Sequence, residues 1–286
     1  MSARGRGIPG WLVLLFLVGV VWIVQRQLQV RAARSEYLVV QTDRALLEPG
    51  VPWVDPRWEP ELRARLASQE DFRPDDGEAR GDLRERVEAL SFVAEVGQAE
   101  VLWPDGVRLD LRLRQPVACV PVGASFYPVG RDGVLLSGVW DAPPPIGPGH
   151  LPVLGPLDGG CDALRPGDAL EEPTRLDALA TAASLLDHLD DPALGLLGRT
   201  VIDASRARFA SPDEPGLRLF LEEERVVWFG RAANTEEPGE LSVGDKWDSL
   251  ARALHLWDAG DSDWDLVDVR WDTPELRERV APPSDG

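Results

Sequence analysis

The chain has 286 residues, of which 44% are hydrophobic and 28% charged, an ordinary globular composition with enough apolar residues for one large or two modest cores. Its formal net charge at pH 7 is -19, and no Asp or Glu precedes Glu36. An acidic body is repelled by nucleic-acid phosphates and anionic headgroups, which argues against both as ligands of the folded part. Basic or neutral proteins are the partners that this charge favours.

The first predicted element is an apolar helix over residues 8–25, after a short cytoplasmic stub at 1–7. Residues 8–24 carry no charge, and these 17 residues reach about 26 Å at 1.5 Å each, close to the thickness of a hydrocarbon core. Two tryptophans lie near the ends, where aromatic side chains sit in membranes. We therefore predict one transmembrane helix, with the bulk of the chain outside the cytoplasmic (inner) membrane. The predicted anchor residues are Trp11, Val13, Phe16, Val20 and Trp22.

A cleaved signal peptide is the alternative, because the apolar run from Trp11 to Val24 also has the length of an h-region. The small residues Ala32 and Ala33 are flanked by arginines, which is a poor match to an A-x-A-like cleavage site. The sequence therefore favours a retained span.

Residues 36–115 predict a small α+β unit. Its expected elements are an extended segment at 37–40, helices at 60–67 and 82–90, and strands at 96–103 and 107–114. Asp82 is a candidate N-cap of the second helix. Apolar and charged residues alternate along 107–114, which indicates a strand with one buried face, and a Pro-Asp-Gly turn joins it to the strand before it.

Residues 116–275 predict a second, β-rich mixed domain, followed by a flexible tail at 276–286. Strands are expected at 116–122, 124–129, 134–138, 200–203, 217–221, 226–229 and 266–271, and helices at 174–189 and 245–257. The first of these helices should turn Leu176 and Leu179 inward, and the second Trp247 and Leu250. The segment 140–150 is rich in Pro and Gly, which favours a loop.

Neither a metal centre nor a catalytic site is predicted. The two cysteines, Cys119 and Cys161, match no metal motif; separate buried thiols are the commoner situation, and a single bridge stays open. His150, His188 and His255 have no companion catalytic motif, so surface or helix-end positions are expected.

The densest carboxylate cluster favours solvated turn residues before a strand. It lacks the Gly and the terminal Glu of a calcium loop. Its members are Asp258, Asp261, Asp263, Asp265 and Asp268. We predict no cofactor, no metal and no small-molecule substrate.

Trp271 ends the last predicted strand, beside charged residues at 275–279, and is expected on a sheet edge. Exposed edges recruit partner strands unless they are blocked.

Four ordered motifs resemble the FtsQ/DivIB family of bacterial cell-division proteins. The first motif is similar to the end of that family's POTRA domain and reads LSFVAEVGQAEVLWPDGVRLDLRLRQPVACV. The second, YPVGRDGVLLSG, resembles the family's "D-x-x-G-x-V" strand pair, and the third, LPVLGP, resembles its "L-P-x-L-x-G". RVVWFGR, KWDSLARAL and DLVDVRW resemble its "V-x-L-G", "K-L-x-x-L" and "V-D-L-R-Y" series. Arg114-Gln115 replaces the usual Glu-Arg, and Trp271 stands for the usual Tyr.

The resemblance implies an α+β fold with a single N-terminal transmembrane helix, a POTRA-like domain and a β domain. It implies a non-enzymatic scaffold of the divisome at the septum, acting on septal peptidoglycan synthesis through the bitopic coiled-coil proteins FtsB and FtsL. Family members engage FtsB by strand addition near the C-terminal strand. Carried over to this chain, the partner-binding residues are Val267, Val269, Arg270, Trp271, Arg231 and Lys246.

Two other functions stay open. A POTRA-bearing secretion or envelope-assembly component is motivated by the same small α+β unit. An anchored envelope hydrolase is suggested only by the acidic cluster and His188.

Overall fold

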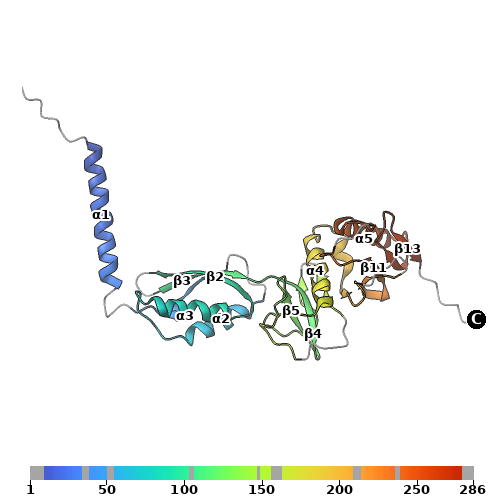
Figure 1. Cartoon of the computed structure of the whole chain (residues 1–286), viewed down its shortest axis with the longest axis horizontal. Coiled ribbons are helices and arrows are strands. Elements are labelled where there is room, and N and C mark those ends of the chain that lie inside the picture. Colours follow the sequence, from blue (N-terminus) through green and yellow to red (C-terminus); the bar gives the residue numbers. More distant parts are fainter. Residues whose placement is uncertain are drawn as a thin grey trace, which may run out of the picture. The chain divides into compact units, whose positions relative to one another are not determined.

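The computed structural model describes residues 10–33, 39–49, 55–102, 106–146, 149–155, 163–208, 214–235 and 239–278 (Figure 1). The chain divides into two compact units, each with helices and strands. The first comprises Met1–Pro52, Glu59–Glu88 and Glu95–Arg112, and the second comprises Trp53–Trp58, Ala89–Ala94 and Leu113–Gly286.

The helix α1 (Gly10–Ala33) overturns the predicted span. Over the described ranges, no helix combines the length and the apolar character that a membrane crossing requires. Side chains of α1 are described from 16 to 28; there the apolar run ends at Val24 and polar residues follow. The prediction of a transmembrane helix over 8–25 is therefore wrong.

The predicted anchor residues fall partly outside what the structure describes. The side chains of Trp11 and Val13 lie outside the described part of α1. The exposed fractions of Phe16, Val20 and Trp22 are 72%, 38% and 59%.

The first unit is a three-stranded sheet with two helices along one face (Figure 1). Its elements are β1 (Leu46–Glu48), α2 (Trp58–Ala67), α3 (Gly77–Glu88), β2 (Val93–Leu102) and β3 (Gly106–Leu113), preceded by the 3₁₀ turn η1 (Thr42–Arg44). The strand order is β1-β3-β2, with β1 parallel to β3. Alternation along β3 buries Val107, Leu109 and Leu111, and Leu62 of α2 and Leu83 of α3 are also buried.

The predicted α2, β2 and β3 are confirmed in this unit. α3 begins at Gly77 rather than at Asp82, because the Asp76 carboxylate accepts the amide N–H of Ala79 at 2.9 Å and caps the helix earlier. Val40, at the end of the expected extended segment, pairs with Phe72 in an isolated bridge. The predicted turn, with Trp103, lies outside the described residues.

The second unit contains a mixed eight-stranded sheet in the order β13-β12-β11-β10-β9-β8-β4-β5. Its strands are β4 (Pro116–Val122), β5 (Ser125–Gly130), β8 (Val153–Leu154), β9 (Val201–Asp203), β10 (Leu217–Phe220), β11 (Val226–Gly230), β12 (Trp264–Asp268) and β13 (Glu275–Glu278). Its other elements are the small pair β6 (Pro145–Ile146) and β7 (Gly149–His150), α4 (Pro173–Asp187), α5 (Val243–Asp258), and the 3₁₀ turns η2 (Leu194–Leu197) and η3 (Glu222–Glu224).

The core of this unit centres on Trp247 of α5. Its ring lies 4.6 Å from that of Phe229 on β11, and its indole N–H donates to Ser184 Oγ on α4 at 3.0 Å. The expected inner residues of α5 are all buried, which confirms the predicted face. Leu179 of α4 is buried as expected, but Leu176 is 37% exposed and its predicted inward position is wrong.

Several predicted boundaries in this unit are wrong. Residues 134–138 form only isolated bridges, since the chain turns at Gly138, whose φ of +113° an L side chain rarely adopts. The loop at 140–150 contains the short pair β6 and β7. Most important for the site, β12 ends at Asp268, and residues 276–278, expected as tail, belong to β13.

The turn between β10 and β11 stores backbone strain at two glutamates. Glu223 has φ 59° and Glu224 φ 63°, a conformation that favours Asn-Gly and costs an L side chain about 1 kcal/mol. Glu224→Gly is therefore expected to raise the free energy of unfolding by about 0.5–1 kcal/mol, measured by urea denaturation. Glu222→Gly is the matched control and should lower it, because φ of Glu222 is not positive. A urea midpoint for Glu224→Gly below that of the wild type would contradict the proposed backbone strain.

Candidate partner-binding edge of the sheet

One end of the large sheet is formed by β11, β12 and β13. β12 pairs in parallel with β11 and antiparallel with β13, and β13 is the outermost strand. The segment 269–274 reverses the chain between β12 and β13. The prediction that the strand ending at Trp271 forms the edge is therefore wrong. We call the outer side of Glu275–Glu278 the β13 edge.

The β13 edge presents polar side chains over a well-anchored backbone. Leu276 pairs with Val267 across the strands and packs against the core. The other three residues, Glu275, Arg277 and Glu278, are exposed. The strand is thus held by one apolar contact and its ladder to β12, while its charges point to solvent.

An internal ion pair supports the turn that leads into β13. Arg270 is 2% exposed, and its Nε and Nη2 donate to the two carboxylate oxygens of Asp268 at 2.9 and 2.7 Å. Its Nη1 donates to the carbonyl of Glu214 at 2.6 Å. The guanidinium also lies 5.4 and 5.2 Å from the ring centres of Trp228 and Trp271. The hydrogen bond to Asp268 raises the pKa of Arg270.

A second buried ion pair joins α5 to the end of β11. Lys246, the single lysine of the chain, is 2% exposed, and its Nζ donates to Glu240 Oε2 at 2.6 Å. That carboxylate also accepts the backbone N–H of Arg231 at 3.0 Å. Burial lowers the pKa of the Lys246 ammonium, against the opposing effect of Glu240. A Cβ at Gly230 would lie 2.5 Å from Glu240 Oε2, so glycine is required for this approach.

The six predicted partner-binding residues all lie at this end of the sheet, but in two different situations. Val267 and Val269 are 0% exposed, and Lys246 and Arg270 are 2% exposed, so these four support the edge from inside. Arg231 and Trp271 are half-buried and reach the surface. The sequence reasoning missed β13 itself, although the alternation of apolar and charged residues in PELRE after a proline was a usable signal.

Comparison with models of known protein families found no match for this sequence, and neither did a search of curated proteins.

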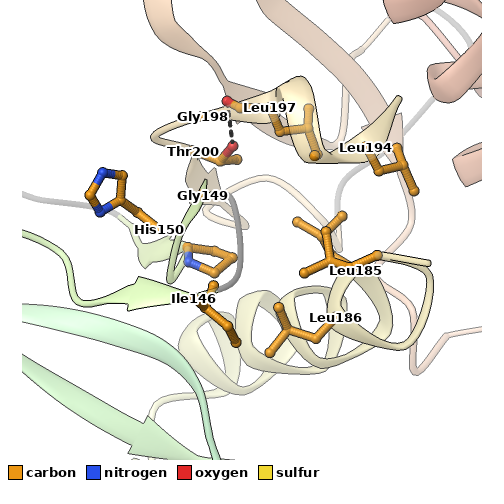
Figure 2. Close-up of a pocket in the computed structure, with 12 residues that line it drawn as sticks. Ile146, Gly149, His150, Leu185, Leu186, Leu194, Leu197, Gly198 and Thr200 are labelled. Carbon is orange, nitrogen blue, oxygen red and sulfur yellow. Dashed lines mark hydrogen bonds between the residues drawn. The ribbon is translucent and has the colours of Figure 1, made fainter. Parts of the chain in front are cut away.

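A small cavity lies elsewhere in the second unit (Figure 2). Leu185 and Leu186 of α4 and Leu194 of η2 point into it, and its volume of about 20 Å³ is room for about one water molecule. The imidazole of His150 lies away from these leucines, with Nδ1 2.9 Å from the carbonyl oxygen of Pro143. The hydroxyl of Thr200 donates to Leu197 at 3.3 Å. A substrate-sized ligand does not fit this space.

Of the other candidate residues, His188 and two members of the acidic cluster are held in structural contacts. Nδ1 of His188 is 2.7 Å from the carbonyl oxygen of Ser184 at the end of α4, and His255 is exposed on α5. In the acidic cluster, Asp268 pairs with Arg270, and Asp263 lies 3.5 Å from Arg225. Throughout the residues that the structure describes, no group of three or more His, Cys, Asp or Glu is placed to hold a metal ion.

Cys119 is a buried thiol on β4. Burial raises its pKa to about 12, which keeps it protonated at neutral pH. Cys161 lies outside the described residues, so the alternative of a bridge stays a prediction.

Proposed function

We propose that this protein is a non-enzymatic scaffold of bacterial cell division that binds a small bitopic coiled-coil protein of the FtsB and FtsL kind. It would act at the septum, on the extracytoplasmic side of the cytoplasmic membrane, and recruit or regulate septal peptidoglycan synthesis. The resemblance of four ordered motifs to the FtsQ/DivIB family motivates the proposal. The element order β1-α2-α3-β2-β3 of the first unit is consistent with the POTRA-like domain that the resemblance implies.

The observation that carries the proposal is the position of β13 at the end of the sheet. An outermost strand offers backbone N–H and C=O groups on its outer side, and a partner segment can pair with them as a further strand. β13 lies next to the rigid strands β12 and β11, so the added strand would extend an existing sheet. The ion pairs Asp268–Arg270 and Glu240–Lys246, whose basic side chains are buried, support this end of the sheet from inside.

The test blocks the backbone of β13 with proline. Neighbouring residues of an antiparallel strand direct their N–H groups to opposite sides, so either Arg277 or Glu278 donates outward. Of the two variants Arg277→Pro and Glu278→Pro, the one that removes an outward N–H should keep its thermal midpoint. It should bind the extracytoplasmic segment of the same organism's FtsB-like protein at least about tenfold more weakly. The other variant, which breaks the ladder to β12, is the matched control for instability.

Hydrogen exchange on the unmodified full chain provides a second readout. Outward amides of β13 should become protected when the FtsB-like segment is bound, because they enter a new ladder. Wild-type affinity in the folded proline variant, or no gain of protection at 275–278, would overturn the proposal.

A further inference from the structure

The two ends of the large sheet differ in whether their outer strand is covered. At β5, the segment that follows it covers the outer side with two isolated bridges, Phe126 to Trp140 and Val129 to Leu135. At β13, none of the bridges among the described residues reaches the outer side of Glu275–Glu278. An uncovered outer strand keeps its backbone N–H and C=O groups available for pairing with another chain. The β13 edge is therefore a place where a second copy of this chain can pair.

Antiparallel geometry limits the registers in which two β13 strands can pair. Opposite residues must both direct their backbone groups toward the other strand, or both away from it. For two identical strands related by a two-fold axis, one residue must then lie opposite its own copy. Centring the pair on Glu275, Arg277 or Glu278 sets two like charges directly opposite, which is destabilising. Leu276 is therefore the favoured centre.

The register centred on Leu276 sets opposite charges against each other. Glu275 of each copy lies opposite Arg277 of the other, so the two-fold axis produces this ion pair twice. Leu276 lies opposite its own copy, on the face of the sheet where it packs against the core. Glu278 lies opposite Pro274, which is uncharged and has no backbone N–H. Charged and apolar positions of the two copies thus match in this register.

Glu275 stays available to Arg277 of a second copy although it also interacts with a buried guanidinium. It lies opposite Asp268 in the ladder, and its charge contributes to the raised pKa of Arg270. Asp268 already accepts two hydrogen bonds from Arg270, so these three side chains together keep one surplus negative charge. Arg277 lies opposite the apolar Leu266 within its own sheet. When two copies pair, each Arg277 neutralises the surplus charge of the other copy.

We infer that two copies of this chain pair antiparallel through β13, in the register centred on Leu276, and join their sheets into one. A four-residue ladder buries far less than the roughly 1,600 Å² of a standard interface, so the dimer is weak and reversible. The formal net charge of -19 on each copy opposes pairing. At about 0.15 M salt the screening length is about 8 Å, which removes most of this long-range repulsion.

The dimer occupies the same edge as the partner strand of the proposed function. A second copy and the FtsB-like segment are therefore expected to exclude each other, because an outer strand has one open side. Only this exclusion rests on the proposed function. Dimerisation itself follows from the uncovered edge and from the match of its charges.

Charge reversal at Arg277 tests the register. Sedimentation equilibrium of the full chain, from about 10 µM to about 1 mM at about 0.15 M salt, should show monomers in equilibrium with dimers. Arg277→Glu turns both ion pairs into like-charge pairs and should raise the dissociation constant of the dimer at least about tenfold. Glu278→Gln is the matched control, because its opposite residue is uncharged, and should leave that constant within about twofold. Both positions are exposed, so thermal midpoints should change by only a few degrees.

A mixture of two variants should restore the pairing. Glu275→Lys also opposes like charges and should weaken the dimer by itself. In an equimolar mixture with Arg277→Glu, each charge of one variant lies opposite a complementary charge of the other. Mixed dimers should therefore form at least about tenfold more tightly than the dimers of either variant alone.

Several results would overturn the dimer. One is a wild-type chain that remains monomeric over the whole concentration range. Another is undiminished association of Arg277→Glu, which is expected if the exposed apolar residues of α1 hold the copies together instead. A mixture that associates no better than its components would contradict the register, and so would a loss with Glu278→Gln as large as with Arg277→Glu.

The outcomes separate this inference from the proposed function. A charge-dependent dimer, together with wild-type binding of the FtsB-like segment by the folded proline variant, upholds the dimer and overturns the proposed function. A monomeric wild type, together with lost binding in the proline variant, does the reverse. Saturating FtsB-like segment should dissociate the wild-type dimers, and complexes that contain two copies of the chain would contradict the mutual exclusion.

Discussion

Removing the carboxylate of Glu240 is expected to lower the free energy of unfolding by about 3–5 kcal/mol. Lys246 is 2% exposed and donates to that carboxylate at 2.6 Å, so Glu240→Ala leaves a buried ammonium with no ion-pair partner. The same change frees the N–H of Arg231, which the carboxylate accepts at 3.0 Å. Chemical denaturation monitored by tryptophan fluorescence measures the effect.

The matched control removes both charges. The double variant Glu240→Gln, Lys246→Met removes both charges of this pair. The methionine replaces the cation–π contact of the Lys246 ammonium with the Phe229 ring, at 5.1 Å, by an apolar contact. It should recover most of the lost stability, because replacing a buried ion pair by groups of similar volume is often neutral. A double variant as unstable as Glu240→Ala would mean that packing of Glu240, rather than charge compensation, is what the single change removes.

The pH dependence gives an independent check on Lys246. Its pKa in the folded protein is lowered from 10.5, chiefly by burial. The unfolded chain therefore binds more protons than the native one between the lowered pKa and 10.5, and stability contributed by this group rises with pH across that window. The rise should be absent in the double variant. An identical alkaline profile in both proteins would contradict the burial effect.

The parts of the fold that the sequence predicts correctly are those with strong periodicity. α5 and β3 have regular apolar patterns, and the sequence predicts both elements together with the face that each one buries. The uncharged run over 8–24 predicts a span, but no helix among the described residues combines the length and the apolar character that a membrane crossing requires.

The resemblance implies that Lys246 and Arg270 contact a partner, but the structure buries both side chains. Charged residues are usually exposed, so a sequence pattern does not predict this burial. Only the tertiary structure supplies the carboxylates that allow their burial. The tail predicted from 276 is instead the greater part of β13, three of whose four residues are charged. Strand propensity disfavours this composition, but it suits an edge.

Replacing Asp268 by Ala should lower the free energy of unfolding by about 2–4 kcal/mol and weaken partner binding at the same time. Arg270 is 2% exposed and loses its two hydrogen bonds to the Asp268 carboxylate, while it keeps the carbonyl of Glu214 and the neighbouring tryptophan rings. The loss should be smaller than for Glu240→Ala, because this guanidinium retains a hydrogen bond. Urea denaturation of the full chain measures the first effect.

The effect on binding follows from the position of the pair in the chain. Asp268 ends β12, and Arg270 begins the turn that returns as β13, so the ion pair positions the edge rather than touching the partner. Amides of β13 should therefore exchange faster in Asp268→Ala, at temperatures where β10 and β11 stay protected. Arg131→Gln is the control, since it breaks an exposed pair with Asp187 far along the chain and should change neither readout by much. If Asp268→Ala were destabilised as a whole, with β13 no more affected than β10, the pair would be a general core contact and not a support of this edge.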